Sequence, residues 1–144
     1  RRTVKQAGLT RFIAICLLTG YVWLGISGLS AMWFGGVPVG PQYDATLHAF
    51  FLGFVFAMIF AHAPIIFPAV LGARMTYRPL FYAHVVLLQV TLAVRLIGDV
   101  AGWSAGRQVG GLLNAVTLLL FLVNTVSALQ SPPERAGTAQ GRGA

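Results

Sequence analysis

Four long apolar stretches alternate with short polar segments along the chain. Runs without a charged residue cover 12–34, 45–73, 79–94 and 108–133. A helix needs about 20 residues to cross a bilayer, and each run reaches that length when it is extended by a turn. Alternating strand patterns are absent, and only helices or closed barrels satisfy the backbone in lipid. The pattern therefore predicts an all-α fold, an integral membrane four-helix bundle.

The polar segments set the boundaries of the predicted helices. We expect membrane spans at about 11–34, 44–72, 79–101 and 107–130. Asp44 is expected to cap the second span, and Pro79 suits the first turn of the third. The four spans form one predicted domain, residues 1–131. The remaining segment, 132–144, is polar and rich in Gly and Pro, which predicts a disordered cytoplasmic tail.

Composition supports a membrane protein, and the placement of charge predicts its orientation. The chain is 57% hydrophobic and 9% charged, whereas soluble proteins have about 25% charged residues. Its net charge of +7 could indicate a nucleic-acid partner. However, most basic residues flank the spans on one side: Arg1, Arg2, Lys5, Arg11, Arg74, Arg78, Arg135 and Arg142. By the positive-inside rule both termini are cytoplasmic, in a multi-pass protein of the cell inner (plasma) membrane, and no nucleic acid is expected.

Small residues predict close helix packing of the first span, and aromatic residues predict the depth of the first and third spans in the bilayer. Gly20, Gly25 and Gly28 lie in the first span, where small residues let membrane helices approach closely. Trp33 and Trp103 fall at the outer ends of the first and third spans. Aromatic belts occur at this level of a bilayer, so both tryptophans are expected at the outer interface.

Three histidines lie inside the apolar stretches: His48, His62 and His84. A polar group at membrane depth costs free energy unless the protein binds it, so intramembrane histidines are candidates for function. His48 and His62 are 14 residues apart. Fourteen α-helical steps sum to about 1400°, close to four turns, which predicts two rings on one face roughly 21 Å apart. Neutral imidazole is a common axial ligand of b-type haem, so all three are candidate haem-iron ligands.

Each histidine also has a purely structural interpretation. His48 can bind water or Asp44, four residues earlier. His62 can donate to Gln89 or to a backbone carbonyl freed by Pro64.

His84 lies nearer the cytoplasmic face, where water is expected to reach it. His62 and His84 could instead clamp one haem between the second and third spans. Two bis-histidine haems would need four ligands, and Met58 or Met75 would have to supply the fourth.

Other polar residues in the spans predict contacts within the bundle. Arg95 and Asp99 have the i,i+4 spacing that allows them to pair on one helix face. Asn114 and Asn124 are expected to form hydrogen bonds between helices.

One part of the second span resembles a known family. Segments 47–53 (LHAFFLG) and 68–74 (PAVLGAR), followed by Pro79, resemble the second helix and following loop of haem-copper oxidase and nitric oxide reductase catalytic subunits. A histidine near the outer start of that helix binds the low-spin haem in this superfamily. The resemblance implies that His48 is an axial ligand, and Arg95 lies at a suitable level to pair with a haem propionate. The chain lacks the later helices that bear the copper ligands, so we expect neither copper nor oxygen or nitric oxide reduction.

Motifs for independent catalysis are absent from the sequence. There is no phosphate-binding loop, no nucleophile beside a base, and no zinc-ligand spacing. Two functions remain. The chain is a haem b-binding membrane subunit for electron transfer in a respiratory-type complex, or a cofactor-free accessory or structural subunit of a larger respiratory or photosynthetic complex. Both predict a lipid bilayer around the chain and contacts with other membrane subunits or with further copies of itself.

Overall fold

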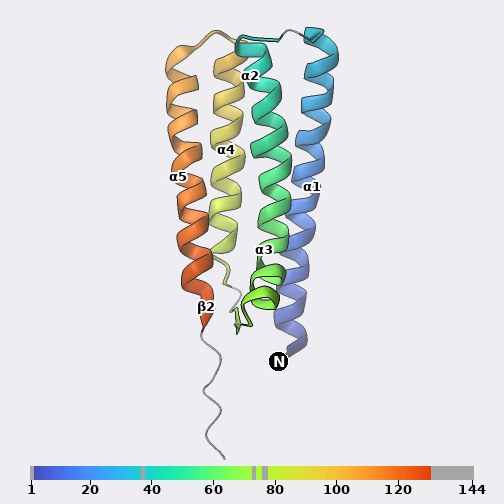
Figure 1. Cartoon of the computed structure of the whole chain (residues 1–144), viewed down its shortest axis with the longest axis vertical. Coiled ribbons are helices and arrows are strands. Elements are labelled where there is room, and N and C mark those ends of the chain that lie inside the picture. The colour runs from blue at the N-terminus through green and yellow to red at the C-terminus, as the bar shows by residue number, and fades with distance from the viewer. Residues whose placement is uncertain (1, 37, 73, 76–77, 131–144) are drawn as a thin grey trace, which may run out of the picture.

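The structure, a computed structural model, describes residues 2–36, 38–72, 74–75 and 78–130, with side chains from residue 8 onward except those of 74 and 130. Its elements in chain order are α1 (Arg2–Phe34), α2 (Pro41–His48), the π-helix η1 (Ala49–Val55), α3 (Phe56–Leu71), β1 (Arg74–Met75), α4 (Phe81–Val100), α5 (Ser104–Ala128) and β2 (Leu129–Gln130). Helices run along the long axis of the molecule (Figure 1). The tail predicted at 132–144 lies outside the described residues.

Four helical segments are long and apolar enough to cross a membrane. They cover Gly8–Phe34, Pro41–Leu71, Phe81–Val100 and Ser104–Ala128. Successive segments run in opposite directions, in the order α5, α4, α2 with α3, and α1 across the view of Figure 1. The prediction of an all-α chain with four candidate spans is therefore confirmed.

Two predicted helix starts differ from the structure. The second span begins at Pro41 with Gly40 as its N-cap, so Asp44 lies inside the first turn and caps nothing. Proline suits this first position because its missing N–H would have no helical partner there. The third span begins at Phe81, so Pro79 belongs to the turn that precedes it.

The second span is not a uniform α-helix. Ala49–Val55 forms a π-helix between α2 and α3. Because π-helical bonds connect residues i and i+5, each turn holds more residues and the following side chains are rotated relative to an α-helix. The calculation that places His48 and His62 on one face assumes α-helical steps throughout, so it does not hold here.

Glycines bring α4 and α5 into close contact. A Cβ added to Gly98 would lie 2.6 Å from the backbone N of Arg107, and one added to Gly110 would lie 2.8 Å from the backbone N of Arg95. Such separations are below any ordinary contact, so only glycine allows this packing. The two helices thereby fix the relative positions of Arg95 and Arg107.

The predicted role of the α1 glycines is only partly right. A Cβ on Gly20 would lie 2.5 Å from Cε of Met58 and 3.2 Å from Cβ of Ala57, both in α3, as expected for close packing. Gly25 and Gly28 have no described atom within 4 Å of that position. A second close contact on this side comes from Gly53 of η1, where an added Cβ would lie 2.5 Å from the Cβ of Trp23.

Two apolar clusters fill the space between the helices. The larger lies toward the end of the bundle that holds the N-terminus, and its largest buried members are Phe12, Phe60, Phe81, Leu88 and Phe121. The smaller contains Trp23, Ala49 and Leu92. Strands β1 and β2 pair antiparallel and join the loop after α3 to the end of α5. Many large apolar side chains point outward, as expected for helices that face lipid.

Candidate functional site

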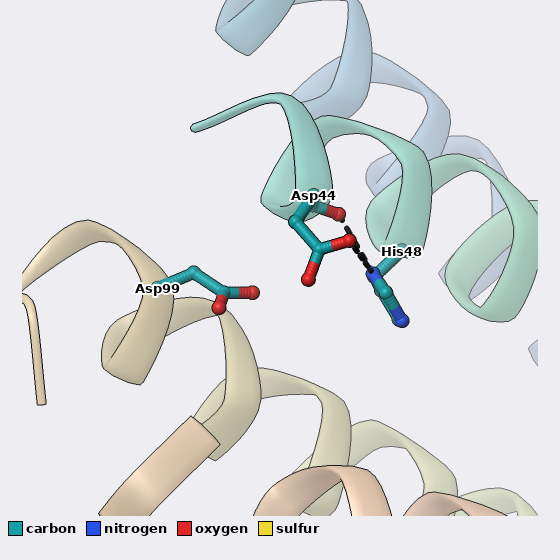
Figure 2. A group of neighbouring side chains, drawn as sticks. All are labelled: Asp44, His48 and Asp99. Carbon is teal, nitrogen blue, oxygen red and sulfur yellow. Dashed lines mark hydrogen bonds and ion pairs between the residues drawn. The ribbon is translucent and has the colours of Figure 1, made fainter. Parts of the chain in front are cut away.

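Polar side chains from three helices meet at the end of the bundle opposite the N-terminus. We call the following five residues the carboxylate–arginine cluster: Asp44 and His48 of α2, Arg95 and Asp99 of α4, and Arg107 of α5. Figure 2 shows Asp44, His48 and Asp99 of this cluster. Both aspartates of the sequence lie in the cluster although 55 positions separate them.

Ion pairs connect the members of the cluster. Arg95 Nη2 donates to Asp44 Oδ2 over 2.9 Å. Asp99 lies between the two arginines, with its Oδ2 3.9 Å from Arg95 Nε and its Oδ1 3.6 Å from Arg107 Nε. The Asp99 side chain is 0% exposed, so its charge depends on these two neighbours. The predicted pairing of Arg95 with Asp99 is confirmed.

His48 is held by the residue one turn before it. Its Nδ1 lies 2.7 Å from the carbonyl oxygen of Asp44 and 3.7 Å from Asp44 Oδ1. A carbonyl oxygen only accepts hydrogen bonds, so Nδ1 carries the proton in the neutral ring and Nε2 keeps its lone pair. Nε2 points away from Asp44 (Figure 2). The predicted contact with Asp44 is confirmed, and it leaves the other nitrogen free to bind.

The cluster has donors for a metal ion, but its charges argue against one. Asp44, His48 and Asp99 each offer one ligand atom, and these atoms lie within 4.8 Å of one another. Arg95 and Arg107 already balance the two carboxylates. A divalent cation would have to share the carboxylates with two guanidinium groups, at a cost in charge repulsion. We therefore assign no metal ion to a site shared by Asp44, His48 and Asp99.

His62 occupies an exposed position on α3. Its Nδ1 lies 2.7 Å from the carbonyl oxygen of Met58, so its Nε2 also keeps a free lone pair. The predicted acceptors for the His62 N–H, Gln89 and a backbone carbonyl freed by Pro64, are therefore both wrong. Gln89 Oε1 instead accepts a hydrogen bond from Trp23 Nε1, which links α4 to α1.

His84 lies inside a cage of aromatic rings. It is 2% exposed, so the prediction that water reaches it is wrong. The distances between its ring centroid and those of the cage members are 4.7 Å to Phe60, 5.2 Å to Phe121, 5.7 Å to Phe81 and 6.4 Å to Phe12. All four contacts are edge-on. Among the described residues, neither ring nitrogen has a hydrogen-bond partner.

The structure places the three histidines in three different environments. His48 belongs to the carboxylate–arginine cluster, His62 faces outward, and His84 is caged. The cavity that His84 lines has a volume of about 170 Å³. Sites for drug-sized ligands measure roughly 300–1,000 Å³, so a porphyrin does not fit beside His84. A haem clamped between His62 and His84 inside one chain is therefore inconsistent with the packing.

Some polar contacts follow from the sequence and others do not. Asn114 Oδ1 accepts from Thr91 Oγ1 over 2.6 Å, which confirms the predicted hydrogen bond between helices. Asn124 forms no such bond within the described residues, because its Nδ2 has no partner there. Sequence reasoning missed Arg107 as a cluster member. The sequence signal for this contact is the glycine pair Gly106 and Gly110, which allows α5 to approach α4 closely.

Comparisons with known proteins identify a family for the chain. No curated protein and no solved structure matches it. The model of one family matches residues 1–130. The chain therefore belongs to the family described as "Domain of unknown function (DUF8744)".

Proposed function

We propose that the chain is a haem b-binding membrane subunit that transfers electrons within a larger assembly. One observation carries this proposal: His48 and His62 both donate from Nδ1 to a backbone carbonyl four residues earlier, at 2.7 Å, and among the described residues Nε2 of neither ring has a hydrogen-bond partner. Histidines that bind metals almost always donate their other ring N–H to a carbonyl, carboxylate or water. That bond fixes the tautomer and orients the ring, so both imidazoles are prepared to act as ligands.

The surroundings of His62 favour a site completed by another chain. An exposed imidazole in a membrane span costs free energy unless a partner satisfies it. Neither His48 nor His62 lines any of the cavities found among the described residues. A haem would therefore lie against the outer surface of the bundle, and another subunit or a second copy would supply the remaining axial ligand.

The residues of this chain would hold and orient the haem. When bound, its iron supplies one-electron oxidation and reduction. Because 14 residues of one span separate His48 from His62, each is the proposed ligand of a separate haem iron, and Arg95 is the proposed partner of a propionate of the haem at His48. Asp44 already binds the Arg95 guanidinium, so a propionate would have to share Arg95 with it. His84 is left out of this proposal because its cage excludes a porphyrin.

Titration of the purified chain with haemin tests the ligand assignment. We expect a Soret band typical of histidine ligation, and loss of at least half of its amplitude in His48→Ala or His62→Ala. His84→Phe is the matched control, because a phenyl ring fits the aromatic cage, and its spectrum should match wild type. Equal spectra for all four proteins would contradict the assignment.

We further place both termini on the cytoplasmic side of the cell inner membrane. The N-terminal part of α1 and the start of α4 lie at the same end of the bundle (Figure 1). Arg11 belongs to the first of these segments and Arg78 directly precedes the second, and such residues accumulate on the cytoplasmic side. The carboxylate–arginine cluster then lies at the outer face. Labelling of a single introduced cysteine with a membrane-impermeant maleimide tests this, since native Cys16 is buried. A cysteine at Gln42 should react in intact cells, and one at Arg78 should react only after lysis.

A second function is favoured by the charge balance of the cluster. Its two aspartates and two arginines neutralise one another, so the cluster is complete without a ligand. This suits a cofactor-free accessory subunit in which the ion pairs only join α2, α4 and α5. Absence of haem from both the purified chain and the haemin titration would favour this alternative.

A further inference from the structure

His62 lies on a surface of α3 that faces away from the bundle and is otherwise apolar. Its neighbours on this surface are Ile59 and Ile66, which are 40% and 51% exposed, and the exposed Ala69. The span ends at Leu71, nine residues beyond His62, which is about 14 Å along the helix. The imidazole therefore lies within the depth of the hydrocarbon, where a polar group needs a partner.

The π-helix η1 accounts for the outward direction of His62. A π-helical segment adds a residue to a helix without adding the rotation of an α-helical step. The 14 residues from His48 to His62 then rotate about as far as 13 α-helical steps, roughly 1300°, which leaves the two rings about 140° apart. The structure agrees, since His48 joins the carboxylate–arginine cluster and His62 is exposed. An α-helix throughout would turn His62 back toward the side of the cluster.

The hydrogen bond of the His62 ring determines what it can bind. Nδ1 donates to the carbonyl oxygen of Met58 over 2.7 Å, so Nε2 offers only a lone pair. Two such rings cannot form a hydrogen bond with each other, because both present an acceptor. They can bind opposite sides of one metal ion, as the two axial ligands of a haem iron do.

We propose that two copies of this chain face each other through this surface of α3, and that their two His62 rings are the axial ligands of one haem iron. The inference rests on the proposed haem function and identifies the partner at His62 as a second copy. A two-fold axis along the bilayer normal places the same residue of both copies at the same depth. Identical surfaces would also bring like charges together, and the run 45–73 contains no charged residue.

Haemin titration of the His48→Ala chain in detergent micelles tests the shared site, because His62 is then the remaining proposed ligand. We expect about one haem for every two chains, a low-spin bis-histidine electron paramagnetic resonance spectrum, and a haem-dependent change from monomer to dimer in sedimentation. The His48→Ala, His62→Ala chain measures haem held by the micelles alone. One haem per monomeric chain would overturn the shared site and leave the proposed function intact. Absence of haem beyond that control would overturn both.

Substitutions on the exposed surfaces test where the two copies meet. In the His48→Ala chain, Ile66→Trp adds a large ring one turn from His62 and should abolish the haem-dependent dimer. Leu122→Trp adds the same ring to α5, at a position that is 54% exposed, and should leave the dimer unchanged. Melting curves without haem check that both variants fold. Equal dimer fractions for the two variants would overturn the assignment of this surface.

Discussion

Arg95 of α4 donates to Asp44 of α2 over 2.9 Å between Nη2 and Oδ2. The bond crosses from the helix pair α4 and α5 to the pair formed by α1 and the second span. Asp99 extends the connection to Arg107 of α5. The carboxylate–arginine cluster therefore joins three helices at one end of the bundle, while apolar packing and the Thr91–Asn114 hydrogen bond act elsewhere.

Removing the buried carboxylate of the cluster should destabilise the bundle strongly. Asp99→Asn leaves Arg95 and Arg107 with a single carboxylate between them, and the expected loss is roughly 3–5 kcal/mol, as for a broken buried pair. Asp44 is 41% exposed, so Asp44→Asn should cost only about 1 kcal/mol. Chemical unfolding in detergent micelles measures both. Equal losses for the two variants would show that burial does not determine the strength of these pairs.

Close packing between α4 and α5 should make Gly110 intolerant of any side chain. A Cβ there would lie 2.8 Å from the Arg95 backbone, so Gly110→Ala should cost roughly 1–3 kcal/mol by overpacking. Gly25→Ala is the matched control, since Gly25 is also helical and meets no described atom within 4 Å. It should be neutral or more stable by up to about 1 kcal/mol. Melting curves in one detergent rank the variants, and a Gly110→Ala protein as stable as Gly25→Ala would contradict the packing.

The hydrogen bond between Thr91 and Asn114 should contribute modestly to stability. A double-mutant cycle with Thr91→Val and Asn114→Leu should give a coupling free energy of about 0.6 kcal/mol, the mean for hydrogen bonds between membrane helices. Both residues are buried, at 2% and 3% exposure, so the single variants also report packing. The coupling term isolates the bond. A coupling energy indistinguishable from zero would mean that the 2.6 Å contact contributes no net stability.

Hydropathy alone predicted most of the fold. Long apolar runs have one outcome in lipid, so the four helices appeared within a few residues of their expected ends. The second span shows the limit of this reasoning. Nothing in the composition of 49–55 distinguishes π-helical from α-helical bonding, and that choice decides the relative orientation of His48 and His62.

The candidate site was only partly predictable. Contacts within one helix, such as Asp44 with His48 and Arg95 with Asp99, follow from i,i+4 spacing, and the structure contains both. Contacts between helices depend on how each helix is rotated about its axis and on its depth in the bundle. The hydrophobic periodicity of the sequence determines neither. The sequence therefore placed His84 near water, whereas four phenylalanines from α1, α3, α4 and α5 enclose it.

The absorption spectrum of the full chain, purified from cells supplied with haem, tests the central claim most directly. In the reduced-minus-oxidised spectrum we predict the α-band of a b-type haem for the wild-type chain and its absence from the His48→Ala, His62→Ala double variant. A wild-type chain without an α-band, or a double variant that retains it in full, would contradict the account.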